Sequence, residues 1–485
     1  MNYNPIKNLK RGGMLVVSSA LFSLCLLSSC EDYTEIIPKG RNMLTKTTDL
    51  EYLLNHTYQP GSTDMIEIAN NYIYSSTNVA LELESDVKTR KQIRWSYDEA
   101  SMDKLAELTA SDEDYDECYE IIGTVANPIL MQLPTASGPE EKKNQLKCEA
   151  LTLRAYFHYL AVQKFAAAYN PATAAETRAI AYLKEDADIL KETEQVTLKE
   201  VYDNILADLD EAISLDALPQ TAPMMRMNKA CPYAVKALVC MAMQDNDKAE
   251  EAAKQALAIN GTVNNYFESL VPFVSKSETV YQLLSLSRYG IDEDYFYTWG
   301  VIYAANIPPS NWDFFEKGHI WHDKSKTDWV RNDYKEGSSN AGLGWYSISD
   351  QDGGYNDHGL RTVDMYLTVA ECEIDKGNFD AAMEALDKIR VNRIDPEVYA
   401  PLMGTVKNKK DAIYHFKQTE YGEHFYTYQG FICKKRWTQK TDYAETYSRT
   451  INGKTYSIAP TSKMWIFPFP LNVMSINSKF KQNYK

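Results

Sequence analysis

The chain has 485 residues, of which 44% are hydrophobic and 12% aromatic, with 51 Lys and Arg against 67 Asp and Glu. The net charge of −16 excludes nucleic acid and anionic lipid as favoured partners, because both would be repelled at long range. The most apolar stretch, Met14–Leu27, is too short to cross a hydrocarbon layer about 30 Å thick. A channel, a DNA-binding protein and a disordered acidic tail are therefore excluded.

The N-terminus has the three parts of a bacterial secretory signal. Three basic residues precede the apolar run Met14–Leu27, and Ser28-Ser29-Cys30 follows it, which matches the lipobox of bacterial lipoproteins. The alternative is an ordinary signal peptide with an incidental cysteine. We expect residues 1–29 to be removed and Cys30 to be acylated, which anchors the protein because each buried methylene contributes about 0.8 kcal/mol. Without these residues 48 basic side chains face 67 acidic ones.

Helical periodicity dominates the middle of the chain. Apolar residues recur every three or four positions, and Gly261 stands where a helix C-terminus is expected. Lys376-Gly377-Asn378 interrupts the later pattern and predicts a turn between two helices. The predicted helices are Leu146–Leu160, Leu198–Ala212, Tyr233–Met243, Asp247–Asn260, Val363–Ile374 and Phe379–Val391.

Two of the predicted helical hairpins resemble each other in sequence. Asn246–Ala253 aligns with Asn378–Ala385 at an offset of 132, which places Ala249 on Ala381. Small residues four apart let antiparallel helices approach closely, as in tetratricopeptide repeats. The two hairpins are not tandem, because about 100 residues (261–360) separate them.

This insert, residues 261–360, differs from the helical segments in composition. It carries five of the eight Trp residues among Gly, Asn, Asp and Ser, and it shows no lasting helical period. Such a long segment without periodicity indicates function, and its rings form either small cores under loops or binding platforms. Trp and Tyr faces beside Asn, Asp or Arg suit the apolar faces and hydroxyls of sugars. The candidate ligand-binding residues are Arg94, Trp95, Tyr97, Trp299, Trp312, Trp321, Trp345 and Tyr346.

Motifs for catalysis or cofactor binding are absent from the sequence. It has no P-loop, no dinucleotide fingerprint, no H-E-x-x-H and no G-x-S-x-G, so we expect a binding protein and no enzyme. His319 and His322 lack a third ligand and are interpreted as surface or packing residues. Asp112, Asp114 and Asp116 are interpreted as the acidic first turn of a helix.

We expect no cofactor. Calcium at Asp350–Asp357, a loop rich in side-chain oxygens, is the alternative. Six cysteines remain after Cys25 and Cys30, and none forms a C-x-x-C pair, so neither a disulfide framework nor a zinc framework is expected.

Five segments in order behind the lipobox resemble the SusD/RagB family, surface lipoproteins of Bacteroidetes that work beside TonB-dependent transporters. They contain an Ala-Asn helix, an E-A-x-x-x-R-A helix, an Asp-Leu-Asp helix, an A-E stretch followed by N-R, and a tail, Gln482-Asn483-Tyr484, that is similar to the family's Q-N-x-Y. Departures occur at Glu420–Trp437, which lacks several charged positions of the family, and at Ala166–Ala168, which replaces a glycine. The matching segments are Tyr115–Leu130, Lys147–Leu160, Tyr202–Ile213, Arg361–Arg393 and Trp465–Tyr484.

The resemblance implies an all-α, SusD-like fold in which tetratricopeptide-like hairpins form a right-handed scaffold. Residues 30–485 would form a single domain: helices over about 100–260 and 361–393, the loop-rich ligand region 261–360, and a C-terminal tail 394–485.

The resemblance also implies a role. We expect an outer-membrane lipoprotein, lipid-anchored and facing the exterior, that captures an oligosaccharide and passes it to a SusC-like TonB-dependent transporter. Glu31-Asp32 after Cys30 are similar to the family's surface-export signal. Two alternatives stay open: a relative that captures peptides or other nutrients, and a surface glycoside hydrolase, whose carboxylate pair has no local sequence signature.

Overall fold

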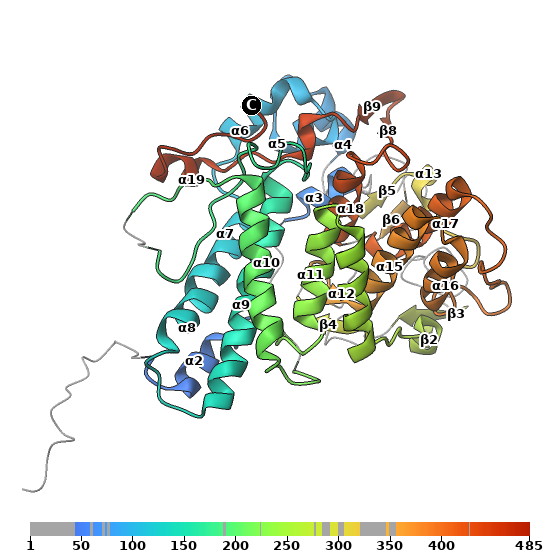
Figure 1. Ribbon diagram of the computed structural model, residues 1–485. Coiled ribbons are helices and arrows are strands. Elements are labelled where there is room, and N and C mark those ends of the chain that lie inside the picture. The colour runs from blue at the N-terminus through green and yellow to red at the C-terminus, as the bar shows by residue number, and fades with distance from the viewer. Residues whose placement is uncertain are drawn as a thin grey trace, which may run out of the picture. The chain divides into compact units, whose positions relative to one another are not determined.

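The computed structural model (Figure 1) describes residues 44–485 with several gaps. Within the described part, no helix combines the length and apolar character needed to cross a membrane. The undescribed residues are 1–43, 59–61, 70–72, 75–77, 188–190, 224, 276–277, 284–291, 299–304, 321–345, 349–355 and 426.

Helices make up most of the described chain. The helices are α2 (Thr47–Leu53), α3 (Asp64–Ala69), α4 (Val79–Glu84), α5 (Arg90–Trp95), α6 (Met102–Leu108), α7 (Glu113–Glu120), α8 (Asn127–Gln132), α9 (Glu140–Phe165), α10 (Leu198–Leu215), α11 (Cys231–Ala242), α12 (Asn246–Ile259), α13 (Pro309–Trp312), α15 (Thr362–Lys376), α16 (Phe379–Arg390), α17 (Lys409–His424), α18 (Tyr428–Trp437) and α19 (Leu471–Ile476). The strands are β1 (Ile73–Tyr74), β2 (Leu270–Ser275), β3 (Glu278–Leu283), β4 (Asp294–Phe296), β5 (Ala305–Ile307), β6 (Tyr346–Ile348), β7 (Leu360–Arg361), β8 (Tyr447–Ile451) and β9 (Lys454–Ile458).

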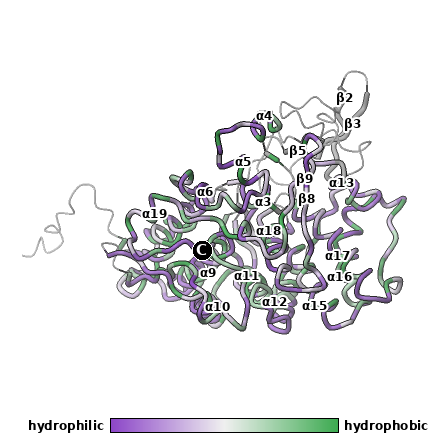
Figure 2. The backbone as a smooth tube through the Cα atoms, turned by 90° about the horizontal axis from the view of Figure 1, so that it is seen from above, coloured by the Kyte–Doolittle hydropathy of each residue, from purple (hydrophilic) through white to green (hydrophobic). Residues whose placement is uncertain are grey.

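The long helices stand in a row of antiparallel neighbours. Helix α9 packs on α10, α10 on α11, α11 on α12, α12 on α15 and α15 on α16, and α17 lies against both α15 and α16 (Figure 1). Helix α18 packs against α3 and α17. The hairpins α11–α12 and α15–α16 are thus adjacent in space although the insert separates them in sequence. The view from above shows the same row, with apolar and polar residues alternating along its helices (Figure 2). This arrangement confirms the predicted all-α scaffold of tetratricopeptide-like hairpins.

The buried faces of the two similar hairpins correspond, but not at the predicted offset. Ala249 is fully buried, whereas Ala381 is exposed and its neighbour Ala382 is fully buried. Helix α12 begins at Asn246 and α16 at Phe379, so Ala249 and Ala382 are both the fourth helical residue. The structural offset is therefore 133, because the helices begin one residue out of step with the sequence alignment.

Glycine has different roles at the ends of α12 and α15. Gly377 adopts φ +83° as the C-cap of α15, a left-handed conformation that glycine accepts without steric cost, as the predicted turn requires. Helix α12 ends just before Gly261, as predicted, with Asn260 as an extended C-cap. Gly261 also gives room to a neighbour: its carbonyl accepts from the Tyr366 hydroxyl at 2.9 Å, and a Cβ at this position would lie 3.0 Å from the Tyr366 hydroxyl oxygen.

Charged residues of the family-like segments hold the first helices together. The Arg154 guanidinium on α9 donates to both carboxylate oxygens of Asp208 on α10 at 2.7 Å, and to Asn127 at 3.2 Å. Asn127 begins α8 directly after a π-helical turn, Ile121–Ala126. The proline at position 128 lacks an N–H group, and the wider turn before it accommodates the missing hydrogen bond. These motif residues therefore build the scaffold.

The insert returns to the frame as short strands. Strand β5 pairs antiparallel with β1 on one side and with β6 on the other, and β4 pairs with β7, which leads directly into α15. Strands β2 and β3 form a separate hairpin. Near the C-terminus, β8 and β9 form a hairpin around Asn452-Gly453, both with positive φ, as tight hairpin turns prefer.

Candidate ligand-binding region

The first group of candidate residues lies on and just after helix α5. Thr89 caps the helix by accepting from the backbone N–H of Gln92. The Trp95 indole is fully buried in a small core with Ile73, Val79 and Ile451. This core joins the α4–α5 region to strand β1 and to the β8–β9 hairpin, so the ring serves as packing between three elements.

Arg94 is buried by an ion-pair network rather than exposed to a ligand. Its guanidinium pairs with the Asp64 carboxylate on α3 and lies 3.9 Å from Glu67. The Trp95 indole N–H donates to Glu67 at 3.4 Å. Paired acceptors on α3 therefore hold both side chains of α5, since buried charges persist where they are paired.

Tyr97 has a left-handed backbone with φ +49° and a buried ring. Its hydroxyl donates to the carbonyl of Ile68 at 3.2 Å, and the Arg449 guanidinium lies 4.3 Å from the ring centroid. Arg449 also donates to the Glu67 carbonyl at 2.9 Å. Strand β8 is thereby fixed against α3 and α5.

The prediction that these residues form an open platform is wrong for this group. Arg94 is 5% exposed, Trp95 0% and Tyr97 6%, so none offers a free face on which a sugar ring could stack. The sequence showed aromatic and basic residues side by side. It did not show that Arg94 and Trp95 are buried against acids 27 to 30 positions earlier.

The core around Trp95 also helps to fix the position of the insert's strands. Ile73, which packs on Trp95, belongs to strand β1 and faces Asn306 of β5, and β5 pairs with β6. Tyr346 is the first residue of β6, so the structure brings its backbone to the sheet beside the α5 group. Trp299, Trp321 and Trp345 lie outside the described residues, as does Cys30. Their predicted roles stay predictions.

Trp312 is the second correction. It ends α13, is 1% exposed, and packs edge-on against Phe315 with ring centroids 5.7 Å apart. Phe315 in turn contacts Tyr421 and Phe425 at the end of α17. Trp312 therefore belongs to a small core that attaches the insert to the helical frame, one of the two roles expected for rings in this segment.

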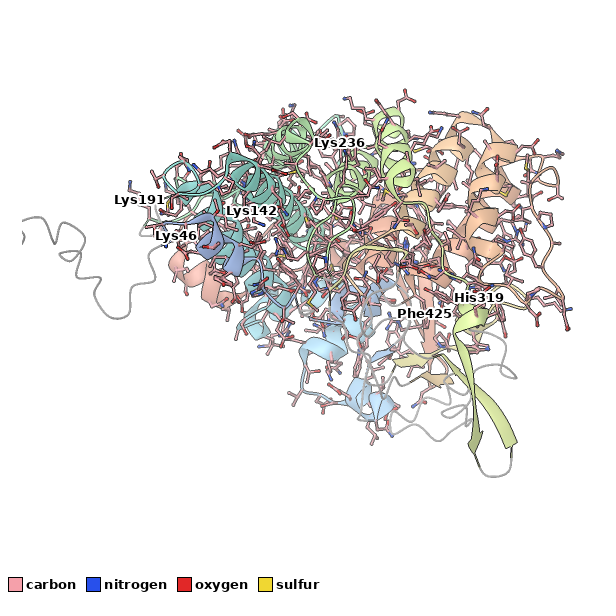
Figure 3. All side chains as sticks on the ribbon, turned by 90° about the horizontal axis from the view of Figure 1, so that it is seen from below. Lys46, Lys142, Lys191, Lys236, His319 and Phe425 are labelled. Carbon is pink, nitrogen blue, oxygen red and sulfur yellow. The ribbon has the colours of Figure 1, made fainter. Side chains whose placement is uncertain are left out.

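His319 belongs to the same attachment and fits the packing interpretation. It is 6% exposed, its ring lies 5.2 Å from that of Phe315, and Figure 3 shows it near Phe425. A Cβ at Gly422 would lie 2.7 Å from its Nε2 atom, so α17 needs glycine there to let the imidazole approach. His322 lies outside the described residues.

A buried charge cluster that the sequence reasoning did not predict connects insert and frame. Arg393 is 1% exposed and donates to Glu423 on α17 at 2.6 Å and to Glu293 of the insert at 3.0 Å. Its guanidinium stacks 3.4 Å from the Tyr266 ring centroid. Burial alone would lower the pKa of Arg393, but the two carboxylates raise it above its ordinary value. The only sequence signal was the family-like N-R pair at the end of α16.

The acidic run before α7 has the predicted role. Asp112 is the N-cap of α7 and accepts from the backbone N–H groups of Asp114 and Tyr115. Both oxygens of Asp112 lie 2.8 Å from the Lys164 ammonium, which also pairs with Asp114. A buried lysine therefore pairs with both of these carboxylates. In the other acidic segment, Asn356 and Asp357 hydrogen-bond with Thr298, while positions 350–355 are outside the described residues.

Comparison with known proteins finds a family match for part of the chain and similar structures for most of it. Residues 38–241 match the family model of SusD-like proteins described as starch-binding and associating with the outer membrane. No curated protein sequence matches the chain. A SusD superfamily protein from Bacteroides thetaiotaomicron has a similar structure, with TM-score 0.65, 14% identity, and coverage of 90% of this chain and 99% of that one.

Two further structures share the fold. Surface glycan-binding protein A from Bacteroides uniformis gives TM-score 0.61 at 15% identity, covering 90% of this chain and 98% of the other. A SusD-like carbohydrate-binding protein from Bacteroides vulgatus gives 0.57 at 14% identity with the same coverage. At these identities the solved structures show that the chain has the SusD-like fold. The resemblance in sequence to the SusD-like family rests on residues 38–241.

Proposed function

We propose that the protein is a cell-surface lipoprotein that captures an oligosaccharide and delivers it to a SusC-like TonB-dependent transporter in the outer membrane. The observation that carries the proposal is the match of residues 38–241 to a family described as starch-binding and associating with the outer membrane. The Bacteroides uniformis neighbour, described as a surface glycan-binding protein, supports the same ligand class.

The architecture supports a binding role based on the insert. Strand pairing with β1, the Trp312 core and the Arg393 cluster fix the insert to the helical frame at separate points. Such attachment lets a rigid frame hold irregular segments in a defined place, which is where binding residues concentrate. With Trp95 and Trp312 buried, the remaining candidates for sugar stacking are Trp299, Trp321, Trp345 and Tyr346. Each stacked ring contributes about 1 kcal/mol, so short ligands should bind with micromolar or weaker affinity.

Electrophoresis in native gels containing single polysaccharides tests the ligand class. The wild-type protein should be retarded in at least one gel, and bovine serum albumin in the same gels serves as the non-binding control. Retardation by none of a broad panel, together with calorimetric binding of peptides, would favour the peptide-capturing alternative. Release of reducing sugar from a retarding polysaccharide would favour the hydrolase.

The anchor and the partner need separate experiments. In cells fed a labelled fatty acid, wild-type protein should carry label and the Cys30→Ala variant should not. Surface protease treatment of intact cells should degrade the anchored protein if it faces the exterior. Affinity purification of the mature protein from outer membranes should recover a TonB-dependent barrel, and its absence after mild solubilisation would contradict delivery to such a partner.

A further inference from the structure

Three residues with different metal-binding atoms converge between helices α17 and α18. Glu420 and His424 are four residues apart on one face of α17, and Cys433 lies on α18. Their carboxylate oxygen, ring nitrogen and sulfur all lie within 4.8 Å of one another. Glu420 Oε1 is 3.1 Å from His424 Nδ1. Tetrahedral ligands about 2.0–2.3 Å from Zn²⁺ lie about 3.3–3.8 Å apart, so small side-chain movements would complete this geometry.

Asp364 on α15 orients the histidine from the other side. Its Oδ1 atom is 2.8 Å from His424 Nε2, and its Oδ2 atom accepts from the Arg361 backbone N–H at 2.9 Å. A carboxylate that accepts from Nε2–H turns Nδ1 toward Glu420 and Cys433. Metal-bound histidines commonly have such a carboxylate partner on the second nitrogen, because it fixes the ring and raises its basicity.

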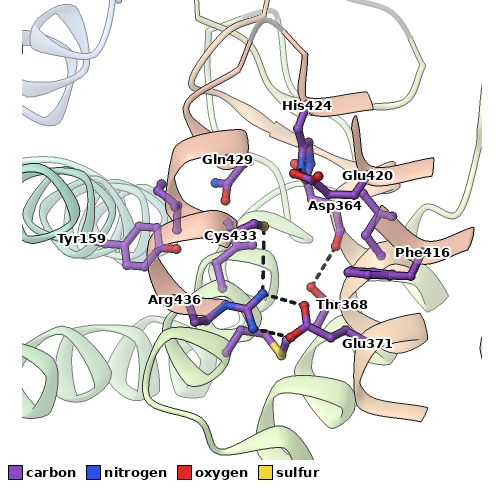
Figure 4. Close-up of a pocket in the computed structure, with 14 residues that line it drawn as sticks. Tyr159, Asp364, Thr368, Glu371, Phe416, Glu420, His424, Gln429, Cys433 and Arg436 are labelled. Atoms are coloured by element: carbon purple, nitrogen blue, oxygen red, sulfur yellow. Dashed lines mark hydrogen bonds and ion pairs between the residues drawn. The ribbon is translucent and has the colours of Figure 1, made fainter. Parts of the chain in front are cut away.

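A small cavity beside these residues has room for one more ligand. Its volume is about 20 Å³, enough for a single water molecule, and its lining includes all three residues and Gln429 (Figure 4). Gln429 is 3% exposed, and its Nε2 group has no hydrogen-bond acceptor among the described residues. A water in the cavity, as a fourth metal ligand, would accept a hydrogen bond from this buried donor.

Charge balance also fits a divalent cation. His424 lies between two carboxylates, Asp364 and Glu420, so both ring nitrogens face acceptors, as in an imidazolium. A divalent ion that displaces the Nδ1 proton and the Cys433 thiol proton leaves the net charge of the cluster unchanged. Lys434 pairs with the other oxygen of Glu420, Oε2, at 3.6 Å, which leaves Oε1 available. The buried charges around the cluster would therefore stay balanced.

We propose that Glu420, His424 and Cys433 form a Zn²⁺ site, with Asp364 as the carboxylate behind the histidine and a water held by Gln429 as fourth ligand. One oxygen, one nitrogen and one sulfur suit Zn²⁺ better than calcium or magnesium, which take oxygen ligands. The ion would tie α17 to α18, two helices that follow one another in the chain. The spacing, three residues between the first two ligands and eight before the cysteine, lacks the C-x-x-C signature and so gave no sequence signal.

Cobalt provides the most direct test, because Co²⁺ substitutes for Zn²⁺ and reports its ligands optically. Purified mature protein, stripped with a chelator and titrated with CoCl₂, should bind one Co²⁺ per chain with a thiolate charge-transfer band and intense tetrahedral d–d bands. Each Zn²⁺ added to the stripped protein should release about two protons to a pH indicator. Saturation without a thiolate band, or with weak octahedral bands, would overturn the proposal.

Variants assign the site. Cys433→Ser should lose the charge-transfer band and the increase in Tm caused by Zn²⁺. Cys240→Ser, at a buried cysteine on α11 that does not line the cavity, should keep both. If Cys433→Ser fails to fold, alkylation of the wild-type protein replaces it: Zn²⁺ should slow modification of Cys433, identified by peptide mass, and an unchanged rate would contradict the site. Retention of the band in Cys433→Ser would do the same.

Discussion

The helical frame and the insert differ in how their buried contacts are formed. In the frame, long helices lie side by side, and buried pairs such as Arg154–Asp208 and Arg436–Glu371 link neighbouring helices. The described parts of the insert touch the frame through short strands, the Trp312 core and Arg393. Local periodicity therefore describes the frame, while the position of the insert depends on a few contacts between residues far apart in sequence.

This difference assigns separate tasks to the aromatic residues. Trp95 and Trp312, whose contacts the structure describes, are buried where the insert contacts the helical frame. Under the proposed function, ligand binding would then depend on rings elsewhere in the insert. Substitutions at these buried contacts between insert and frame should change the free energy of unfolding. Substitutions at the other rings should change ligand affinity.

The largest effect on stability should come from breaking the Arg393 charge cluster, which connects the insert to the helical frame. Arg393→Met would leave Glu293 and Glu423, 0% and 2% exposed, without their shared cation. We expect a loss of about 3–5 kcal/mol in the free energy of unfolding, the usual cost of an unpaired buried charge. Urea denaturation followed by circular dichroism measures it. Arg390→Met, which removes pairs with the partly exposed Glu316 and Asp387, is the control with a smaller loss. A loss below 1 kcal/mol for Arg393→Met would show that the cluster does not stabilise the contact between insert and frame.

A substitution within the frame tests the repeat offset. Ala382→Leu should cost about 1–3 kcal/mol, because the extra methylenes have no space against α15. Ala381→Leu, one residue earlier on the exposed face, should change stability by less than about 0.5 kcal/mol. The same denaturation experiment compares the two variants. Equal costs, or the reverse order, would contradict the offset of 133.

A smaller effect should appear with pH. Burial lowers the pKa of His158 to about 3, and its Nε2 accepts from the Leu183 N–H at 3.0 Å. The folded state therefore resists a proton that the unfolded chain binds below its pKa of about 6.5, so this contribution to stability is complete above pH 6.5 and falls as pH decreases toward 3. Between pH 7.5 and 5.5 the wild type should lose about 1 kcal/mol more than His158→Gln. Parallel pH profiles for the two proteins would contradict this explanation.

The sequence was sufficient for the frame because periodicity is local. The long helix around Leu146–Leu160, the hairpins and the turn at Gly377 follow from residues within a few positions of one another. The pairing of β1 with β5 joins residues more than 200 positions apart, and no local pattern encodes it. For the same reason, composition around Trp95 and Trp312 identified rings without showing which of them the fold would bury.

The family-like motifs were informative about the fold for a physical reason. Arg154 and Arg393 stand in otherwise buried surroundings, where a charge is stable only with a matching partner. Such residues identify a scaffold, because their partners must be present at fixed places. They say little about a ligand, which would contact side chains outside the buried scaffold.

Affinity and stability measured on the same two variants test the division of tasks most directly. Calorimetry with the oligosaccharide from the most retarding polysaccharide should show at least about fivefold weaker binding for Trp345→Ala, with an unchanged Tm. Trp312→Phe, which keeps a ring at the contact between insert and frame but loses packing, should lower Tm and leave affinity within twofold of wild type. Unchanged affinity in Trp345→Ala, repeated in Trp299→Ala and Trp321→Ala, would contradict ligand binding by the insert's rings.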